Sequence, residues 1–225
     1  MDQLKNQTAQ HYVVVANPLQ ESLDHALARA YAEEVQAQGQ RCRICDLNAI
    51  AFDPVLKRHE KWGTRQATLD PWIDAELNRL GESAAIVLVY PIWFGGPPAI
   101  LKGYIDRVFG AHCDVRKFAD GNGQPALCGK WLLSISTSGT SLGWLQSHGQ
   151  LQALRQSFDV YLERGFGMRD QGHIYIDNVV PNLSRAFVDA QLERAREAAR
   201  HLCGSIIGAE RVRTGVALPA FAEGE

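Results

Sequence analysis

Short apolar runs alternate along the chain with segments in which apolar residues recur every three or four positions. The apolar runs predict β-strands at 11–16, 41–47, 84–90, 130–136 and 173–179. The helical spacing predicts α-helices at 22–38, 71–80, 98–109, 151–162 and 184–202. Every residue of Ala84–Tyr90 is apolar, which is typical of a central parallel strand, because such a strand is covered on both faces.

This alternation of strands and helices predicts one α/β domain. Five strand–helix units favour a flavodoxin-like doubly wound fold, a five-stranded parallel sheet of order 2-1-3-4-5 with helices on both faces. Sheets of this kind bind their ligands at the carboxyl ends of the strands. The domain is expected to span residues 1–211, and the Ala-, Pro-, Gly- and Glu-containing stretch 212–225 is expected to be a mobile tail.

Composition argues against several classes of protein. The 225 residues are 46% hydrophobic and 21% charged, as in an ordinary globular domain, and a net charge of −2 gives no general attraction to nucleic acid or anionic membranes. The apolar runs are too short to span a bilayer, and the first ten residues lack the apolar core of a secretory signal. Five cysteines without disulfide-like spacing suit a reducing compartment, so a cytoplasmic location is expected.

Three loops follow the first, third and fourth strands and should meet at one edge of the sheet. The first, 17–23, enters a helix that Ser22 can cap, which favours a phosphate there, although an ordinary turn has the same pattern. The second, 91–98, carries Trp93 and Phe94, which must pack in the core, pack on another subunit or line the pocket of a flat ligand. The third, 136–141, is rich in Ser, Thr and Gly and suits the polar edge of a flavin, a phosphate or an exposed connection.

The segment Tyr90–Phe109, which reads YPIWFGGPPAILKGYIDRVF, resembles the signature of the NAD(P)H:quinone oxidoreductase (DT-diaphorase) family. Its most specific parts are Pro98–Gly103 and Asp106–Phe109. Two further stretches, 46–56 and 133–139, fall in register with the same family, and the resemblance covers residues 11–203.

This resemblance implies a homodimer that holds FAD or FMN and works by a ping-pong mechanism. NAD(P)H reduces the flavin and leaves, and a quinone-like, azo or nitroaromatic acceptor then takes the hydride. Carried over by position, the cofactor-binding residues are Asn17, Ser22, Leu23 and Asp24 around the flavin phosphates, Pro91, Ile92, Trp93 and Phe94 at the isoalloxazine ring, and Ser136, Thr137, Ser138 and Gly139 at its pyrimidine edge. FAD is slightly favoured by the closeness of 98–109 to quinone reductases, whereas the lack of their long C-terminal extension keeps FMN open.

Four departures from the family pattern bear on the site. Asn17 stands where relatives often have a His, and Asp24 stands where they usually have an Asn, so its carboxylate would repel a phosphate unless it turns away. Ser-Thr-Ser-Gly replaces Thr-Thr-Gly-Gly in the third loop. The Tyr that balances charge on the reduced flavin falls on Trp144, and His148 is the candidate for the catalytic His, or else an exposed residue.

Other functions fit the same pattern. The chain is alternatively an NAD(P)H:FMN reductase that supplies a monooxygenase, or a flavin-binding regulatory subunit of a potassium-efflux system. An electron-carrying flavodoxin is disfavoured by the net charge of only −2. No metal site is expected, because Cys42 and Cys45 should point to opposite faces of a strand. His25, on the polar side of the first helix, and His173, at the start of the last strand, are interpreted as structural or surface residues.

Overall fold

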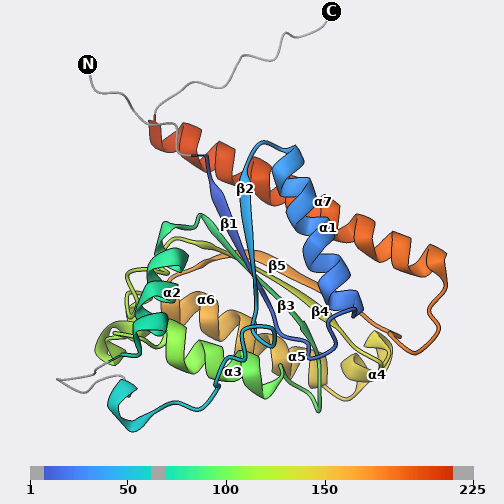
Figure 1. Ribbon diagram of the computed structural model, residues 1–225, viewed down its shortest axis with the longest axis horizontal. Helices are drawn as coiled ribbons and strands as arrows, with labels where there is room; N and C mark the ends of the chain where they lie inside the picture. Colours follow the sequence, from blue (N-terminus) through green and yellow to red (C-terminus); the bar gives the residue numbers. More distant parts are fainter. Residues whose placement is uncertain (1–7, 62–68, 215–225) are drawn as a thin grey trace, which may run out of the picture.

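Five parallel strands form one sheet in the computed structural model, which describes residues 8–61 and 69–214 (Figure 1). The strands are β1 (Gln10–Val15), β2 (Arg41–Asp46), β3 (Ala85–Pro91), β4 (Trp131–Thr137) and β5 (Arg169–Ile176). They lie in the order β2-β1-β3-β4-β5, and each neighbouring pair is parallel. The predicted fold class and strand order are therefore confirmed.

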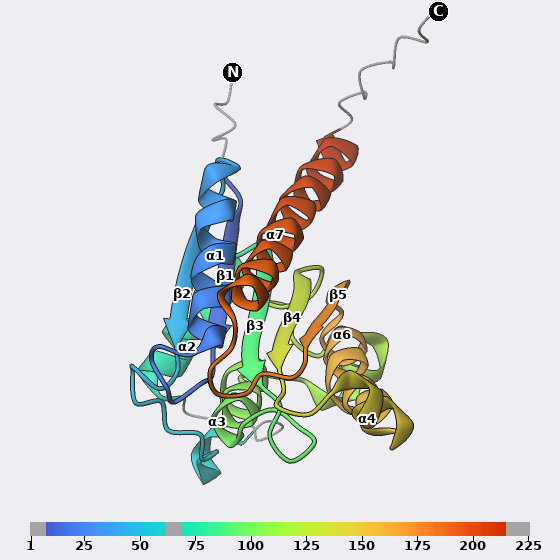
Figure 2. The ribbon, with the colours of Figure 1, turned by 90° about the vertical axis from the view of Figure 1, so that its right-hand side faces the viewer.

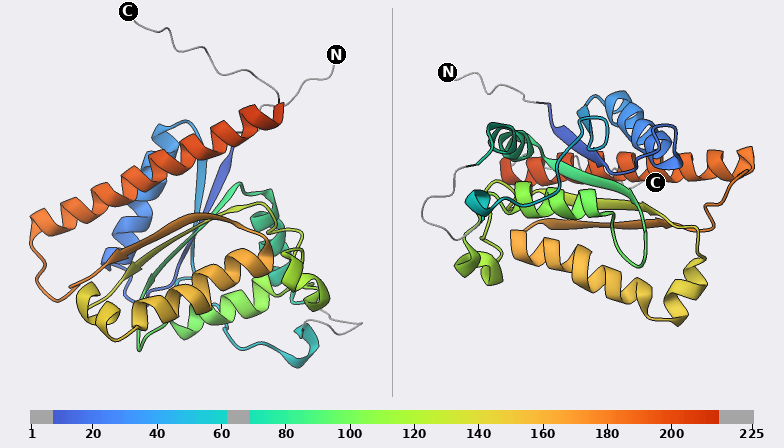
Figure 3. Two further views of the ribbon diagram at one scale, coloured as in Figure 1. Left: turned by 180° about the vertical axis from the view of Figure 1, so that it is seen from behind. Right: turned by 60° about the horizontal axis from the view of Figure 1, so that its bottom comes forward.

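Helices cover both faces of this sheet, as Figures 2 and 3 show. On one face, α1 (Leu23–Ala37) and α7 (Arg185–Thr214) pack over a cluster of buried side chains that includes Val13, Val87 and Ile135. On the other face lie α2 (Pro71–Glu82), α3 (Ala99–Tyr104) and α6 (Val160–Phe166), over a second cluster that includes Tyr12, Leu88 and Leu132. Among the described residues, no helix is both long and apolar enough to cross a membrane.

Two of the predicted helices contain π-helical turns. The segment predicted at 98–109 is α3 followed by the π-turn η2 (Ile105–Phe109). The segment predicted at 151–162 is α5 (Gln150–Leu154), the π-turn η4 (Arg155–Asp159) and the start of α6. Such turns add one residue per turn and redirect the side chains that follow, an effect that apolar spacing does not indicate.

Several boundaries differ from the predictions. The last strand was predicted at 173–179, but β5 begins at Arg169 and ends at Ile176, because its first residues are polar and partly exposed at the sheet edge. The helix α4 (Leu142–Ser147) was not predicted, since only Leu145 of its residues is buried. Helix α7 continues to Thr214, beyond its buried stripe, so residues 212–214 do not belong to a tail, and 215–225 lie outside the described residues. Two 3₁₀-turns, η1 (Arg58–Glu60) and η3 (Val115–Asp120), complete the elements.

Helix α3 and the π-turn η2 after it are fixed against the segment that follows β2. The Arg107 guanidinium donates two hydrogen bonds to the buried Glu60 carboxylate, at 2.8 and 2.6 Å, and one to the Asp53 carbonyl. Burial raises the pKa of Glu60, but the Arg107 hydrogen bonds outweigh it together with the Lys57 amide, so the net shift is downward. A Cβ atom on Gly103 would overlap the backbone of Pro54, so the close approach of the two segments requires glycine. Gly103 and Arg107, two residues of the segment Tyr90–Phe109 that resembles the family signature, therefore have a packing role.

We predict that Gly103→Ala lowers the free energy of unfolding by about 1–3 kcal/mol, because backbone atoms must shift to admit the methyl group. Urea denaturation followed by circular dichroism measures this change. The matched control is Gly204→Ala in α7, where the new Cβ meets open space and the helix should gain about 0.5–1 kcal/mol. Equal stability of the Gly103→Ala variant and the unmodified protein would contradict the packing role.

Candidate functional site

The three loops predicted to form the site meet at the carboxyl edge of the sheet, toward which the strand arrows point in Figure 2. The Ile92 amide donates to the Thr137 carbonyl at 2.7 Å, which joins the loop after β3 to the end of β4. The Thr137 hydroxyl donates to the Asp24 carboxylate at 2.9 Å, which joins β4 to the start of α1. Hydrogen bonds thus hold the loops in fixed relative positions.

Asp24 is the centre of this linkage. Its carboxylate accepts from the Asn17 side-chain amide at 2.6 Å as well as from Thr137, and the residue is only 1% exposed. Burial raises the pKa of Asp24, and the hydrogen bonds from Asn17 and Thr137 offset part of that effect. The carboxylate points into the protein, so it would not face a phosphate bound at the surface of the loop.

The first turn of α1 is held by a Ser–His–Asp chain. Ser22 caps the helix, and its Oγ accepts from the His25 amide and contacts the His25 Nδ1 at 2.8 Å. The other ring nitrogen, Nε2, lies 2.9 Å from the Asp46 carboxylate at the end of β2. His25 is buried, so the expectation of a polar-face position was wrong, whereas a structural role fits. The dipole of this 15-residue helix favours an anion at its capped end.

The loop after β3 presents its aromatic rings outward. The Trp93 and Gly96 backbones exchange two hydrogen bonds, at 2.9 and 3.1 Å, and close a tight turn. Phe94 occupies this turn with φ +51°, a conformation that is strained for a bulky residue, and its side chain is fully exposed. Trp93 is 46% exposed, whereas Ile92 packs against the core. Of the three interpretations of Trp93 and Phe94, a place in the core of one chain is therefore wrong.

The hydroxyl groups of the third loop point mostly inward. The Ser136 and Thr137 side chains are buried and hydrogen-bond to protein groups, and the Ser138 Oγ accepts from the Thr140 amide at 3.0 Å. Gly139 and Thr140 are exposed. A ligand at this edge would therefore meet the backbone of 138–140 rather than a row of free hydroxyls.

Trp144 and His148 lie together on and just after α4. Their rings stack with centroids 4.3 Å apart, and the His148 Nδ1 contacts the Trp144 carbonyl at 2.9 Å and the Ser147 hydroxyl at 3.0 Å. His148 is exposed, and its hydrogen bonds within the described part of the chain stay in this segment. A catalytic role for His148 stays a prediction.

A second imidazole lies at this edge that sequence reasoning missed. The His173 Nε2 is 2.7 Å from the Ser136 Oγ, and its Nδ1 is 2.7 Å from an Asp159 carboxylate oxygen. The side chains of His173 and Asp159 are only 5% and 8% exposed. His173 lies inside β5 rather than at its start, so its predicted position was wrong. No residue spacing in the sequence indicates that these three side chains meet.

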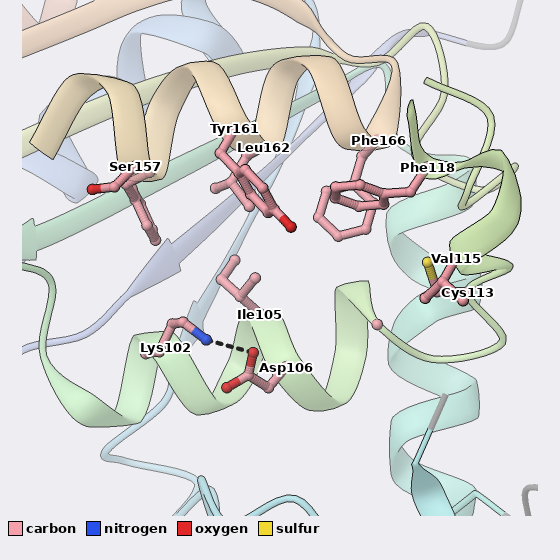
Figure 4. Close-up of a pocket in the computed structure, with 12 residues that line it drawn as sticks. Lys102, Ile105, Asp106, Cys113, Val115, Phe118, Ser157, Tyr161, Leu162 and Phe166 are labelled. Atoms are coloured by element: carbon pink, nitrogen blue, oxygen red, sulfur yellow. Dashed lines mark hydrogen bonds and ion pairs between the residues drawn. The ribbon is translucent and has the colours of Figure 1, made fainter. Parts of the chain in front are cut away.

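A largely apolar pocket of about 410 Å³ lies away from the three loops (Figure 4). It opens between the two π-turns η2 and η4, with Phe118, Tyr161 and Phe166 on its walls. The Lys102 ammonium and the Asp106 carboxylate, four residues apart on one side of the pocket, form an ion pair of 2.6 Å. This pocket occupies the α3–α6 face and does not coincide with the predicted cofactor-binding residues.

The groups at the carboxyl edge fit a flavin nucleotide. The capped start of α1 suits a phosphate, the exposed Trp93 and Phe94 rings suit a flat heterocycle, and the backbone of 138–140 suits the polar edge of that heterocycle. The Asp24 carboxylate, beside the phosphate position, is held inside the protein.

Comparison with known proteins assigns the chain to a family. Residues 9–202 match the model of the flavodoxin-like fold family, and the chain belongs to that family. It is similar to an NAD(P)H oxidoreductase of Haemophilus influenzae, with 29% identity over 62% of this chain and 69% of that protein. It is also similar to NAD(P)H dehydrogenase [quinone] 1 of Cavia porcellus, with 27% identity over 57% of this chain and 53% of that protein. The matched region thus spans little more than half of the latter relative, and the predicted resemblance to quinone oxidoreductases is confirmed.

Solved structures show the same fold. The NAD(P)H:quinone oxidoreductase from Methanothermobacter marburgensis superposes with a TM-score of 0.72 at 21% identity, covering 87% of this chain and 99% of that one. An FMN-dependent NADH-azoreductase from Bacillus anthracis, in complex with FMN, gives 0.65 at 14% identity, covering 86% and 99%.

We predict that Asp24→Asn changes how stability depends on pH. Because burial raises the pKa of Asp24 in the folded state above its ordinary 3.8, stability is full below that value and falls as pH rises through the folded pKa. Each unit of that rise corresponds to about 1.4 kcal/mol. The variant lacks this titration, so its free energy of unfolding should decline less than that of the unmodified protein over the same interval. Urea titrations at several pH values test this, with the exposed Asp106→Asn as control, and parallel curves for Asp24→Asn and the unmodified protein would refute it.

Proposed function

We propose that this chain is a flavin-dependent NAD(P)H oxidoreductase that passes hydride from the nicotinamide, through a bound flavin, to a quinone-like, azo or nitroaromatic acceptor by a ping-pong mechanism. The observation that carries this proposal is the convergence of a capped helix start, two exposed aromatic rings and a small-residue loop at one edge of the sheet. This edge of the sheet therefore offers one surface for the phosphate, one for the flat ring system and one for the polar edge of that ring system.

The residues of the chain have distinct tasks in this proposal. Backbone amides of Leu23 and Asp24, at the start of α1, bind the flavin phosphate with the help of the helix dipole. Trp93 and Phe94 border the ring system and exclude water from it. The Gly139 backbone amide donates to the pyrimidine edge, where it favours negative charge on the ring. The neighbouring Ser138 and Thr140 amides already donate to the Ile176 carbonyl and the Ser138 Oγ. The bound flavin supplies the capacity to accept and release a hydride.

The names of the relatives support NAD(P)H as the hydride donor and a quinone as the acceptor. The predicted class of enzyme, NAD(P)H dehydrogenase of the quinone type, agrees with the relatives from H. influenzae and C. porcellus, and the azoreductase from B. anthracis holds FMN. FMN and FAD both fit the proposal. All five cysteines are free in the structure, which supports the expected cytoplasmic location.

An absorbance spectrum tests the proposal. The purified protein, supplied with FMN or FAD and freed of excess cofactor, should show flavin bands that bleach when NADH or NADPH is added without oxygen. A quinone should restore the bands. Protein that retains neither flavin would refute the proposal, whereas bound flavin that no nicotinamide reduces would favour a regulatory role.

We predict that Phe94→Asn weakens flavin retention about tenfold or more without loss of stability, because it removes the ring but suits the left-handed turn. Equilibrium dialysis measures the dissociation constant, and thermal unfolding without flavin measures stability. Val55→Asn, which removes another exposed apolar side chain from a segment outside the three loops of the proposed site, is the control. Unchanged flavin affinity in Phe94→Asn would show that the Phe94 ring is not part of the flavin site.

We also propose a homodimer, because Phe94 is fully exposed at the site and the α3–α6 face holds an open apolar pocket with the exposed Tyr161 on its wall. A second copy would cover such surfaces. Light scattering at micromolar concentration should give twice the mass of 24.9 kDa. A mass of one chain, with and without flavin, would contradict the dimer.

A further inference from the structure

The Ser22–His25–Asp46 chain at the start of α1 contains an imidazole that the function described above does not use. Ser22 caps the helix at the proposed phosphate position and is partly exposed, so the chain reaches the surface where a ligand would bind. We propose that His25, a positioning residue held by Asp46, takes up one proton from solvent when a flavin phosphate binds and thereby makes Ser22 a hydrogen-bond donor to that phosphate. This inference rests on the proposed function and makes the retention of the cofactor dependent on pH.

The proposed site offers a phosphate little positive charge. None of its three loops, 17–23, 91–98 and 136–141, contains a lysine or an arginine. The first loop instead carries Glu21, and the Asp24 carboxylate is buried in the first turn of α1. The helix dipole attracts an anion, but it corresponds to only about half of an elementary charge. A proton on an imidazole in this turn would add a full positive charge beside the phosphate.

The ring of His25 is held between a hydroxyl and a carboxylate. Its Nδ1 lies 2.8 Å from the Ser22 Oγ, and its Nε2 lies 2.9 Å from one oxygen of the Asp46 carboxylate. The other Asp46 oxygen accepts from the backbone amides of Asn48 and Ala49, at 3.0 and 3.1 Å, which fixes this carboxylate. Because His25 is only 8% exposed, it would act on a ligand through the Ser22 hydroxyl.

The protonation state of His25 decides what Ser22 can offer to a ligand. An ionised Asp46 only accepts, so the His25 Nε2 carries a hydrogen, and Nδ1 of the neutral ring is an acceptor. The Ser22 hydroxyl then donates to Nδ1 and has only lone pairs left for a ligand. In the protonated ring Nδ1 donates to the Ser22 Oγ, which also accepts from the His25 amide. The hydroxyl hydrogen is then free to bind a phosphate oxygen.

Two carboxylates act on this imidazole. Asp46 of β2 forms an ion pair with the ring when the ring is protonated. Asp24 of α1 interacts with it electrostatically: burial raises the pKa of Asp24, and the hydrogen bonds from Asn17 and Thr137, followed by the charge of His25, oppose that rise. Both carboxylates favour a positive ring, and a bound phosphate adds a further negative charge. Binding therefore shifts His25 toward its protonated form, with Asp24 as the other group that could accept the proton.

The test is the pH dependence of the dissociation constant for FMN, measured by flavin fluorescence. Uptake of about half a proton to one proton raises this constant by about threefold to tenfold per pH unit. Measurements between about pH 7 and 8.5 avoid the titration of the FMN phosphate itself, which lies near pH 6 and would change affinity in the opposite sense. Riboflavin lacks the phosphate, so its dissociation constant should stay nearly constant. FAD replaces FMN where the protein retains only FAD.

Three variants identify the group that takes up the proton. His25→Gln keeps hydrogen-bonding groups but does not titrate, so its affinity for FMN should not depend on pH in this range. A merely structural role would weaken binding equally at every pH and leave the pH dependence in place. Asp24→Asn removes the other titratable group and should keep the pH dependence. His201→Gln, which changes an exposed imidazole on α7, is the matched control and should keep it as well.

Calorimetry on the unmodified protein keeps the result decisive where a variant folds poorly. Binding enthalpies near pH 7.5 in two buffers with different ionisation enthalpies count the protons taken up, and about half a proton or more is expected for FMN and none for riboflavin. No uptake with FMN, a pH dependence that persists in folded His25→Gln, or one that disappears in Asp24→Asn overturns the inference while the flavin function stands. Failure of the unmodified protein to bind flavin overturns the function itself and the inference with it.

Discussion

The burial of the central strands on both faces is the constraint on which the rest of this structure depends. All seven residues of β3 are buried, and so are five of the six in β1. Strands of this kind need helices above and below, which requires crossover connections and makes all strands parallel. The carboxyl ends of β1, β3 and β4 then meet at one edge, and the three loops that form the candidate site are neighbours because of it.

The sheet and its helical layers were predicted well from the sequence, because both depend on apolar patterns that extend over whole strands and helices. The strand order, the helical layers and the position of the loops follow from alternation and topology rules. Local irregularities could not be predicted in the same way. The bulge at Gly172 and the π-turn that ends at Asp159 each change the direction of a side chain by one residue of register, and neither leaves a mark on hydrophobic spacing. His173 was therefore placed at the start of the last strand instead of inside it, although its buried position fits the structural role that was expected.

Residue types were also easier to predict than their orientations. The loop after β4 is rich in hydroxyls, as expected for a binding loop, yet Ser136 and Thr137 direct theirs into the protein. In the family-like segment, Gly103 and Arg107 serve the packing of α3 against 53–60. The similarity of this segment to the family signature therefore reflects the packing of α3, which holds the loop 91–98 in place. It does so as much as it reflects the residues of the loop itself.

The tight turn at Phe94 gives the candidate site an unusual freedom to change. Its left-handed backbone is fixed by the Trp93 and Gly96 hydrogen bonds, and the exposed ring makes no contribution to the core. Exchange of this one side chain therefore leaves the scaffold intact while it alters the exposed surface of the loop after β3. Related chains can diverge at this position through single substitutions that preserve folding and differ only in the surface that this loop presents.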